Sequence, residues 1–257
     1  MIPGVDMRSK WKGSVKRSEI NIAIASAIEF FARHQFALPP FASWTRETWA
    51  ELDEVSEFAS RELGWDVTDF NSGNFESIGL TLFALRNGIP SKGNQCMYSE
   101  KIMHVRERQV TPLHFHYRKT EDIINRGGKG TGDLAVQLYN STADGGLADT
   151  PVVVTCDGFR RHCKAGGTIF LRHGESITIT PRLYHTFHAV GGPGLIGEVS
   201  TLNSDSNDNH FFEPIPRYPE VVEDEAPLRL LCTEYPVPQQ LASQRVTNSQ
   251  ETNGKNS

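Results

Sequence analysis

Apolar residues early in the chain recur every three or four positions, which is the period of an α-helix. The first such stretch covers residues 18–36, and Ser18 can cap its amino end. Pro39 and Pro40 follow and would end the helix. The repeating apolar positions are Ile20, Ile24, Ala27, Ile28 and Phe31.

A second helix is predicted over residues 45–63, after which Gly64 supplies a stop signal. We interpret the apolar stripes of both helices as packing surfaces, against a sheet or against a second subunit. The stripe of the second helix consists of Trp49, Leu52, Val55, Phe58 and Ala59.

Beyond Phe75 the pattern changes to short β-rich runs separated by Gly, Pro, Asn or Asp. A parallel sheet would need crossover helices between these runs, and no long helical pattern separates them. The pattern therefore predicts an all-β core, an antiparallel sandwich or barrel. The ten predicted strands are 80–85, 97–105, 110–116, 133–139, 151–156, 168–171, 176–180, 184–190, 195–201 and 228–232.

The chain is expected to have three regions. Residues 1–74 form an N-terminal helical extension that packs on the barrel, and residues 75–236 form the barrel itself. Within the barrel region, residues 203–225 are polar and rich in proline, which predicts a long loop that serves as a lid. Residues 237–257 contain almost no large apolar side chains and are expected to be disordered.

Composition excludes several functional classes. Hydrophobic residues make up 38% and charged residues 22% of the 257 residues, as in ordinary globular proteins. The net charge is −5 and basic residues are not clustered, so nucleic acid is not an expected partner. Neither a signal-type segment nor an apolar run of about 18 residues is found, so we expect no membrane span.

The cysteines point to a reducing compartment. Cys96, Cys156, Cys163 and Cys232 show no C-x-x-C spacing, and three of them lie in strand-like surroundings. We interpret them as reduced thiols rather than disulfides or metal ligands, which predicts a cytoplasmic protein.

Candidate chemistry is concentrated between residues 114 and 121. Alternate side chains of a strand share a face, so His114 and His116 can point toward one position, and Glu121 follows after a short change of direction. A fourth candidate, His185, comes just after a strand-like run and Pro181. Three imidazoles and one carboxylate suit a divalent metal and leave positions open for a substrate. The simpler alternative is that two histidines fall close together in a strand by chance.

Two segments resemble the conserved motifs of the cupins. His114-x-His116-x4-Glu121 followed by Gly127 resembles the first motif, and Gly174 through Pro181 to His185 resembles the second. The resemblance implies a double-stranded β-helix barrel of jelly-roll type with the four ligands at its mouth.

Longer runs are similar to one family of cupin sugar isomerases, the D-lyxose isomerases. They are residues 112–119, 121–128, 197–200 and 207–209, and the similarity extends over about 75–236. The resemblance implies interconversion of D-lyxose with D-xylulose, and usually of D-mannose with D-fructose. It also implies a divalent metal, most often Mn²⁺, although the same ligands serve Co²⁺, Ni²⁺, Fe²⁺ or Zn²⁺.

Aldose–ketose conversion needs a base that moves a proton between C1 and C2. Glu198 is the first choice, because an ionised carboxylate amid Ile196, Gly197 and Val199 suggests a strand that faces a polar cavity. Lys119 lies between two candidate ligands, and its ammonium could hold a substrate hydroxyl or a developing oxyanion, which makes it a second catalytic candidate. The simpler alternative is a surface lysine on a turn.

Three further residues are candidates for substrate contacts. Glu213, Arg217 and Asp208 lie in the polar loop that is predicted to cover the site. Each has a simpler interpretation as a solvated residue of a charged loop.

Several alternatives stay open at this point. An iron-dependent dioxygenase would need an apolar substrate pocket, and a sugar-phosphate isomerase would need cationic anchors, for which Arg118, Arg126 and Arg182 are the nearby candidates. A non-catalytic sugar-binding cupin would keep the metal only for stability. The helical extension and the sheet edges suggest a homodimer.

Overall fold

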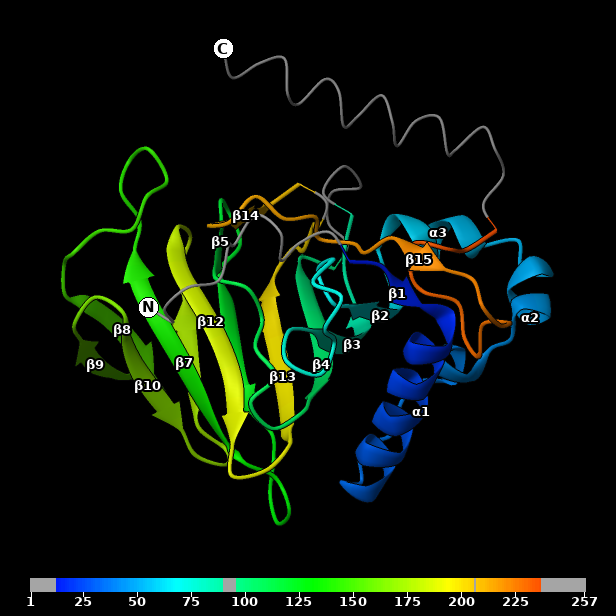
Figure 1. Cartoon of the computed structure of the whole chain (residues 1–257), viewed down its shortest axis with the longest axis horizontal. Helices are drawn as coiled ribbons and strands as arrows, with labels where there is room; N and C mark the ends of the chain where they lie inside the picture. Colours follow the sequence, from blue (N-terminus) through cyan, green and yellow to red (C-terminus); the bar gives the residue numbers. More distant parts are fainter. Residues whose placement is uncertain (1–12, 90–95, 206, 237–257) are drawn as a thin grey trace.

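The computed structural model describes residues 13–89, 96–205 and 207–236. Two antiparallel sheets face each other, and the helices lie beside the larger sheet (Figure 1). The predicted all-β core with a jelly-roll barrel and an N-terminal helix is therefore confirmed. The tail at 237–257 and the first 12 residues lie outside the described part, and within that part no helix is long and apolar enough to span a membrane.

The larger sheet has eight strands and carries one half of the candidate site. Their order across the sheet is β2, β3, β4, β13, β6, β11, β8, β9. In chain order the strands are β2 (Gly64–Thr68), β3 (Leu80–Arg86), β4 (Tyr98–Val105), β6 (Glu121–Asn125), β8 (Val152–Cys156), β9 (Phe159–Cys163), β11 (Ser176–Ile179) and β13 (Gly194–Thr201).

The smaller sheet has five strands and carries the other half. Their order is β10, β7, β12, β5, β14. In chain order they are β5 (His114–His116), β7 (Asp133–Asn140), β10 (Gly167–Leu171), β12 (Leu183–Val190) and β14 (Asn209–Phe211). A separate parallel pair joins β1 (Val15–Lys16) to β15 (Val221–Val222).

The main core fills the space between the two sheets. Ile123 and Ile177 of the larger sheet share one buried cluster with Val136 and Phe187 of the smaller sheet. Along β11 the inward residues Ile177 and Ile179 are fully buried and alternate with more exposed ones, as a half-buried strand requires. This packing holds the sheets face to face and leaves a polar pocket between them.

Helix α1 (Arg17–Arg33) packs its apolar face on the outer side of the larger sheet. Ile24 and Phe31 share a buried cluster with Trp65 of β2 and Phe83 of β3. Ser18 is not the cap that the sequence suggested, because its side chain hydrogen-bonds Asp224 at 2.7 Å. The Lys16 backbone N–H instead donates to the Glu19 carboxylate at 2.9 Å.

The second predicted helix is wrong in its length. A 3-10 helix (η1, Pro40–Ser43) precedes two short helices, α2 (Arg46–Ala50) and α3 (Val55–Ser60), with a turn between them. Glu51, Asp53 and Glu54 fall in that turn, where the negative end of the α2 dipole disfavours carboxylates. The apolar stripe is nevertheless used, since Trp49, Val55 and Ala59 are buried together.

Several strand predictions also need correction. The strand expected at 110–116 is confined to His114–His116, because Pro112 has no N–H to donate to a ladder. Strands β1, β2, β6, β9, β14 and β15 were missed, the last two within the loop predicted at 203–225, and 228–232 forms only a single bridge, from Leu231 to Trp65. All four cysteines carry free thiols, as predicted.

We predict that Ile177→Ala destabilises the protein by about 2–5 kcal/mol, because it removes a fully buried side chain between the sheets. Urea unfolding followed by circular dichroism measures this change. Phe159→Ala is the control, because Phe159 is 76% exposed on an edge strand and its loss should change stability by less than about 0.5 kcal/mol. Equal effects of the two substitutions would contradict the position assigned to the core.

Candidate metal centre

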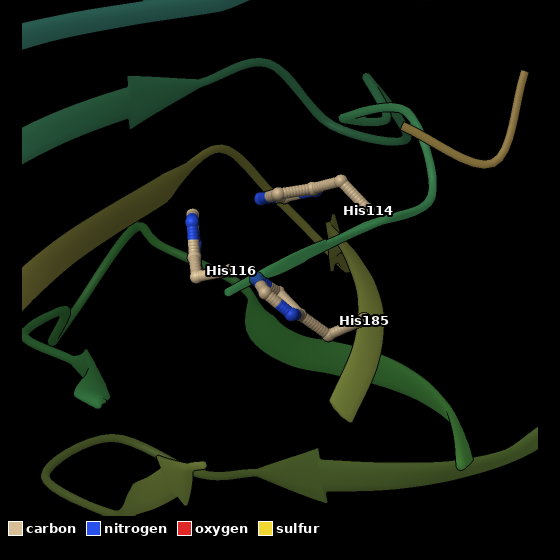
Figure 2. Close-up of side chains that lie close together, drawn as sticks. All are labelled: His114, His116 and His185. Carbon is tan, nitrogen blue, oxygen red and sulfur yellow. The ribbon is translucent and has the colours of Figure 1, made fainter. Parts of the chain in front are cut away.

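Three histidine side chains meet between the sheets. His114 and His116 lie on β5, and His185 of β12 is the register partner of His114. Figure 2 shows the three imidazole rings around one shared space. One ring nitrogen from each lies within 4.8 Å of the others, so the three residues could hold a metal ion.

The hydrogen bonds of two of these rings determine which nitrogen of each ring is available to bind a metal. Nδ1 of His114 donates to the Pro112 carbonyl at 2.8 Å, and Nδ1 of His185 donates to the Leu183 carbonyl at 3.1 Å. A carbonyl can only accept, so each Nε2 keeps its lone pair, as a metal ligand must. Burial lowers the pKa of both His114 and His116, which favours the neutral, ligand-competent imidazole.

Glu121 lies directly against two of the rings. Its Oε1 is 3.0 Å from Nε2 of His185 and 3.4 Å from Nε2 of His116. Although burial opposes ionisation, the Lys119 ammonium and His116 hold the pKa of the Glu121 carboxyl well below its usual range. Nδ1 of His116 is buried without a hydrogen-bond partner in the described part of the chain. The donor set therefore fits a divalent cation.

Lys119 is buried beside this cluster rather than exposed on a turn. Its side chain is 2% exposed, and its Nζ lies 2.6 Å from Oε2 of Glu121 and 2.9 Å from Oε1 of Glu198. Burial alone would lower the pKa of Lys119, but the carboxylates of Glu121 and Glu198 raise it. Lys119 is therefore a fixed cation between two carboxylates.

The charge pattern continues away from the histidines. Glu198 faces Lys101 across the ladder between β13 and β4, with Oε1 to Nζ at 3.5 Å. Lys101 lies 3.3 Å from Asp205, which in turn lies 3.2 Å from Arg217. Arg217 completes the series with an ion pair to Asp66. Positive and negative groups thus alternate from Glu121, beside the histidines, to Asp66.

These groups surround a cavity of about 50 Å³ between the sheets. Its lining combines apolar side chains with ionic groups, as the binding pocket of a small polar ligand does. The polar lining residues are Lys101, Thr111, His114, His116, Lys119, Glu121, His185, Glu198, Asp205, Asn209 and Arg217, and the apolar ones are Phe70, Leu80, Leu82, Met103, Phe187 and Phe211.

The structure brings most of the predicted site residues together. Glu198, Lys119 and Arg217 line the same cavity as the four predicted ligands. Asp208 and Glu213 do not line it: Asp208 is buried against the backbone of residues 118 and 119, and Glu213 is half-buried on the loop.

The sequence interpretation missed two ionic residues of the cavity. Lys101 shares the inward face of β4 with Ser99, Met103 and Val105, and a lysine among buried neighbours is a readable signal. Asp205 carried no comparable signal, because it stands in a uniformly polar stretch.

Glu62 borders the far end of this series. Its Oε2 accepts the Asp205 backbone N–H at 3.1 Å. Burial and the nearby Asp205 carboxylate raise the pKa of Glu62 to about 7, against the lowering effect of Lys101 and Arg217. The protein therefore holds a protonated carboxyl here at mildly acidic pH.

A double-sheet barrel with three inward histidines beside a buried carboxylate defines a cupin with a candidate metal site. The sequence model of the D-lyxose isomerase family matches residues 15–235. The chain belongs to that family and is an aldose–ketose isomerase. The resemblance seen in the sequence is thereby confirmed.

Named relatives agree with this assignment. A D-lyxose/D-mannose isomerase of Serratia proteamaculans is 49% identical over 226 residues, covering 86% of this chain and 98% of that protein. One of Escherichia coli O157:H7 is 48% identical over 227 residues, with coverages of 86% and 98%. The crystal structure of an L-ribose isomerase of Acinetobacter sp. DL28 superposes with a TM-score of 0.55 at 14% identity, covering 82% of this chain and 100% of the other, and shows the fold alone.

We predict that Glu62→Gln raises the melting temperature of the metal-free protein at about pH 8 more than at about pH 5.5. The folded protein keeps the Glu62 proton up to about pH 7, whereas the unfolded chain releases it near 4.5, so wild-type stability falls as pH rises through that window. The glutamine stays neutral and still accepts the Asp205 N–H. Calorimetry of both proteins at the two pH values measures the melting temperatures. An equal change in melting temperature at both pH values would contradict the raised pKa of Glu62.

Proposed function

We propose that the protein is a metal-dependent isomerase that interconverts D-lyxose with D-xylulose, and D-mannose with D-fructose, by proton transfer through an enediol. One observation carries this proposal: the three clustered histidines and the buried carboxylate of Glu198 line one small cavity. The names of the two relatives that are nearly half identical support the choice of sugars.

His114, His116, Glu121 and His185 would hold the metal, with Mn²⁺ as the first choice. The donor set supports a divalent cation, because three imidazoles and one carboxylate converge on one space between the sheets. When bound, such a cation would polarise the oxygens on C1 and C2 and stabilise the charge of the enediolate.

Glu198 is proposed to move the proton. Its side chain is 8% exposed and lies on the cavity wall, so the reacting carbons of a bound sugar come within its reach. Glu198 would take the proton from C2 of the aldose and deliver it to C1 of the enediol, while the proton of the C2 hydroxyl passes to the oxygen on C1, so the carboxylate ends in the form in which it began. The ammonium groups of Lys119 and Lys101, at 2.9 and 3.5 Å, hold the carboxylate in place and compensate its charge.

Lys119 and Arg217 are proposed to bind the substrate. Lys119 joins the proposed base to a proposed ligand, so its ammonium can also donate to a substrate oxygen between them. Arg217 also lines the cavity, where it would donate to hydroxyl groups of the sugar. Glu213 and Asp208 would need the loop to rearrange before they could touch a substrate.

The alternative functions fit the cavity less well. A sugar phosphate would need free cationic anchors, yet Arg118, Arg126 and Arg182 do not line the cavity and the cations that do line it are paired with carboxylates. A cavity crossed by a series of ion pairs is equally unsuited to the apolar substrate of a dioxygenase. The homodimer and the cytoplasmic location stay predictions of the sequence.

We predict that Glu198→Gln lowers kcat for D-lyxose by roughly 10²–10⁴-fold, because the amide cannot accept the proton. D-Xylulose formation in the presence of Mn²⁺ measures the rate, and elemental analysis should find the same metal content as in the wild type. Glu29→Gln, on the exposed face of α1, is the matched control and should leave both quantities unchanged. Full activity of Glu198→Gln would remove Glu198 from the mechanism, and a wild type that converts no pentose or hexose would contradict the proposed function.

A further inference from the structure

A short segment of the smaller sheet closes one side of the cavity. We call residues 207–212 the strap; it contains β14, which pairs with β5 so that Asn209 lies opposite His116 and Phe211 opposite His114. Asn209 and Phe211 line the cavity. Strand β14 of the strap therefore pairs directly with both histidines of β5.

Asp208 lies in the strap at the point where β5 ends. Its side chain accepts two consecutive backbone N–H groups, that of Arg118 at 3.0 Å through Oδ1 and that of Lys119 at 2.9 Å through Oδ2. Its backbone carbonyl accepts the N–H of Tyr117 at 3.1 Å. One residue thus binds three successive N–H groups of the connection between β5 and β6.

The Asp208 carboxylate is directed at the protein backbone and not at the cavity. Asp208 is 4% exposed, and both of its oxygens are engaged by the protein. The exposed Arg118 side chain adds a charge contact at 3.5 Å to Oδ1. Both oxygens thus face the connection between β5 and β6, in agreement with the position of Asp208 outside the cavity lining.

The connection that Asp208 holds carries the centre of the site. Residues 117–120 separate His116, the last residue of β5, from Glu121, the first residue of β6. Lys119 projects from the middle of this connection to both Glu121 and Glu198. The backbone position of Lys119 therefore determines how its ammonium contacts Glu198, the proposed base, and Glu121, a proposed ligand.

From these contacts we propose that Asp208 is a positioning residue of the isomerase site, acting through the backbone of Arg118 and Lys119. Its carboxylate fixes the connection between His116 and Glu121, and so sets the ligand geometry and the aim of the Lys119 ammonium. The inference rests on the proposed metal site and goes beyond it, because Asp208 contacts neither the metal ligands' side chains nor the cavity. The role needs both oxygens of a carboxylate, since an amide offers one acceptor and turns a donor toward the other N–H.

The test is Mn²⁺ affinity, measured by titrating the metal-free protein calorimetrically. Asp208→Asn should weaken Mn²⁺ binding by roughly 10–100-fold, the usual cost of disturbing a group that orients metal ligands. In the loaded enzyme kcat for D-lyxose should fall by more than KM rises, because Lys119 and Glu198 are misaligned while most sugar contacts remain. If Asp208→Asn does not fold, Asp208→Ser, which keeps one short acceptor, takes its place with the same expectation.

Asp69 provides a matched control for the loss of a buried acceptor. It is also buried, and its two oxygens accept the N–H groups of Asn71 at 2.9 Å and of Gly73 at 2.8 Å. Asp69→Asn should lower the melting temperature to a similar degree and leave Mn²⁺ affinity unchanged, since its turn carries no proposed ligand. Equal loss of Mn²⁺ affinity in both variants would reduce Asp208 to a general stabilising role and overturn the inference.

Two further outcomes separate this inference from the proposal on which it rests. A wild-type protein that binds no Mn²⁺ would overturn the proposed metal site and the inference together. A wild type and an Asp208→Asn variant that bind Mn²⁺ equally would overturn only the inference.

Discussion

The site depends on keeping seven charged side chains away from water. In order of contact they are Glu121, Lys119, Glu198, Lys101, Asp205, Arg217 and Asp66. An isolated buried charge costs several kcal/mol, so the series is stable only because each member contacts a neighbour of opposite sign. Loss of a central member would remove one of the two opposite charges that each of its neighbours contacts. This constraint explains why carboxylates and ammonium groups alternate from the histidines to Asp66.

The antiparallel sheet supplies the order of these charges. Lys101 of β4 and Glu198 of β13 are direct cross-strand partners, and Glu121 enters from β6, the next strand along. Since alternate residues of a strand share a face, inward positions on three adjacent strands come together. The second sheet brings His114, His116 and His185 to the same space through β5 and β12. The histidines and the charged residues Lys101, Glu121 and Glu198 are thus held on paired strands.

Much of the site could be predicted because its signals are local. The spacing of His114 and His116 and the alternation of a strand are sufficient to aim both rings at one point, and the unusual carboxylate of Glu198 in an apolar strand indicated a polar cavity. The features that could not be predicted also have physical reasons. Strand β6 was missed because its inward positions, Glu121 and Asn125, are polar, which hides the alternation that identifies a half-buried strand. The backbone contacts of Asp208 could not be predicted, because composition cannot tell a carboxylate that binds backbone from one that faces a ligand.

Deuterium labelling tests most directly whether this pocket isomerises a sugar by proton transfer at a carboxylate. D-Xylulose would be incubated with the Mn²⁺-loaded protein in D₂O until the aldose and ketose reach equilibrium, and the D-lyxose formed would be examined by proton NMR. The account predicts deuterium at C2 of D-lyxose, because the proton held by the base exchanges with solvent between turnovers. D-Lyxose that forms with only protium at C2 would indicate direct hydrogen transfer between the carbons and would contradict the account.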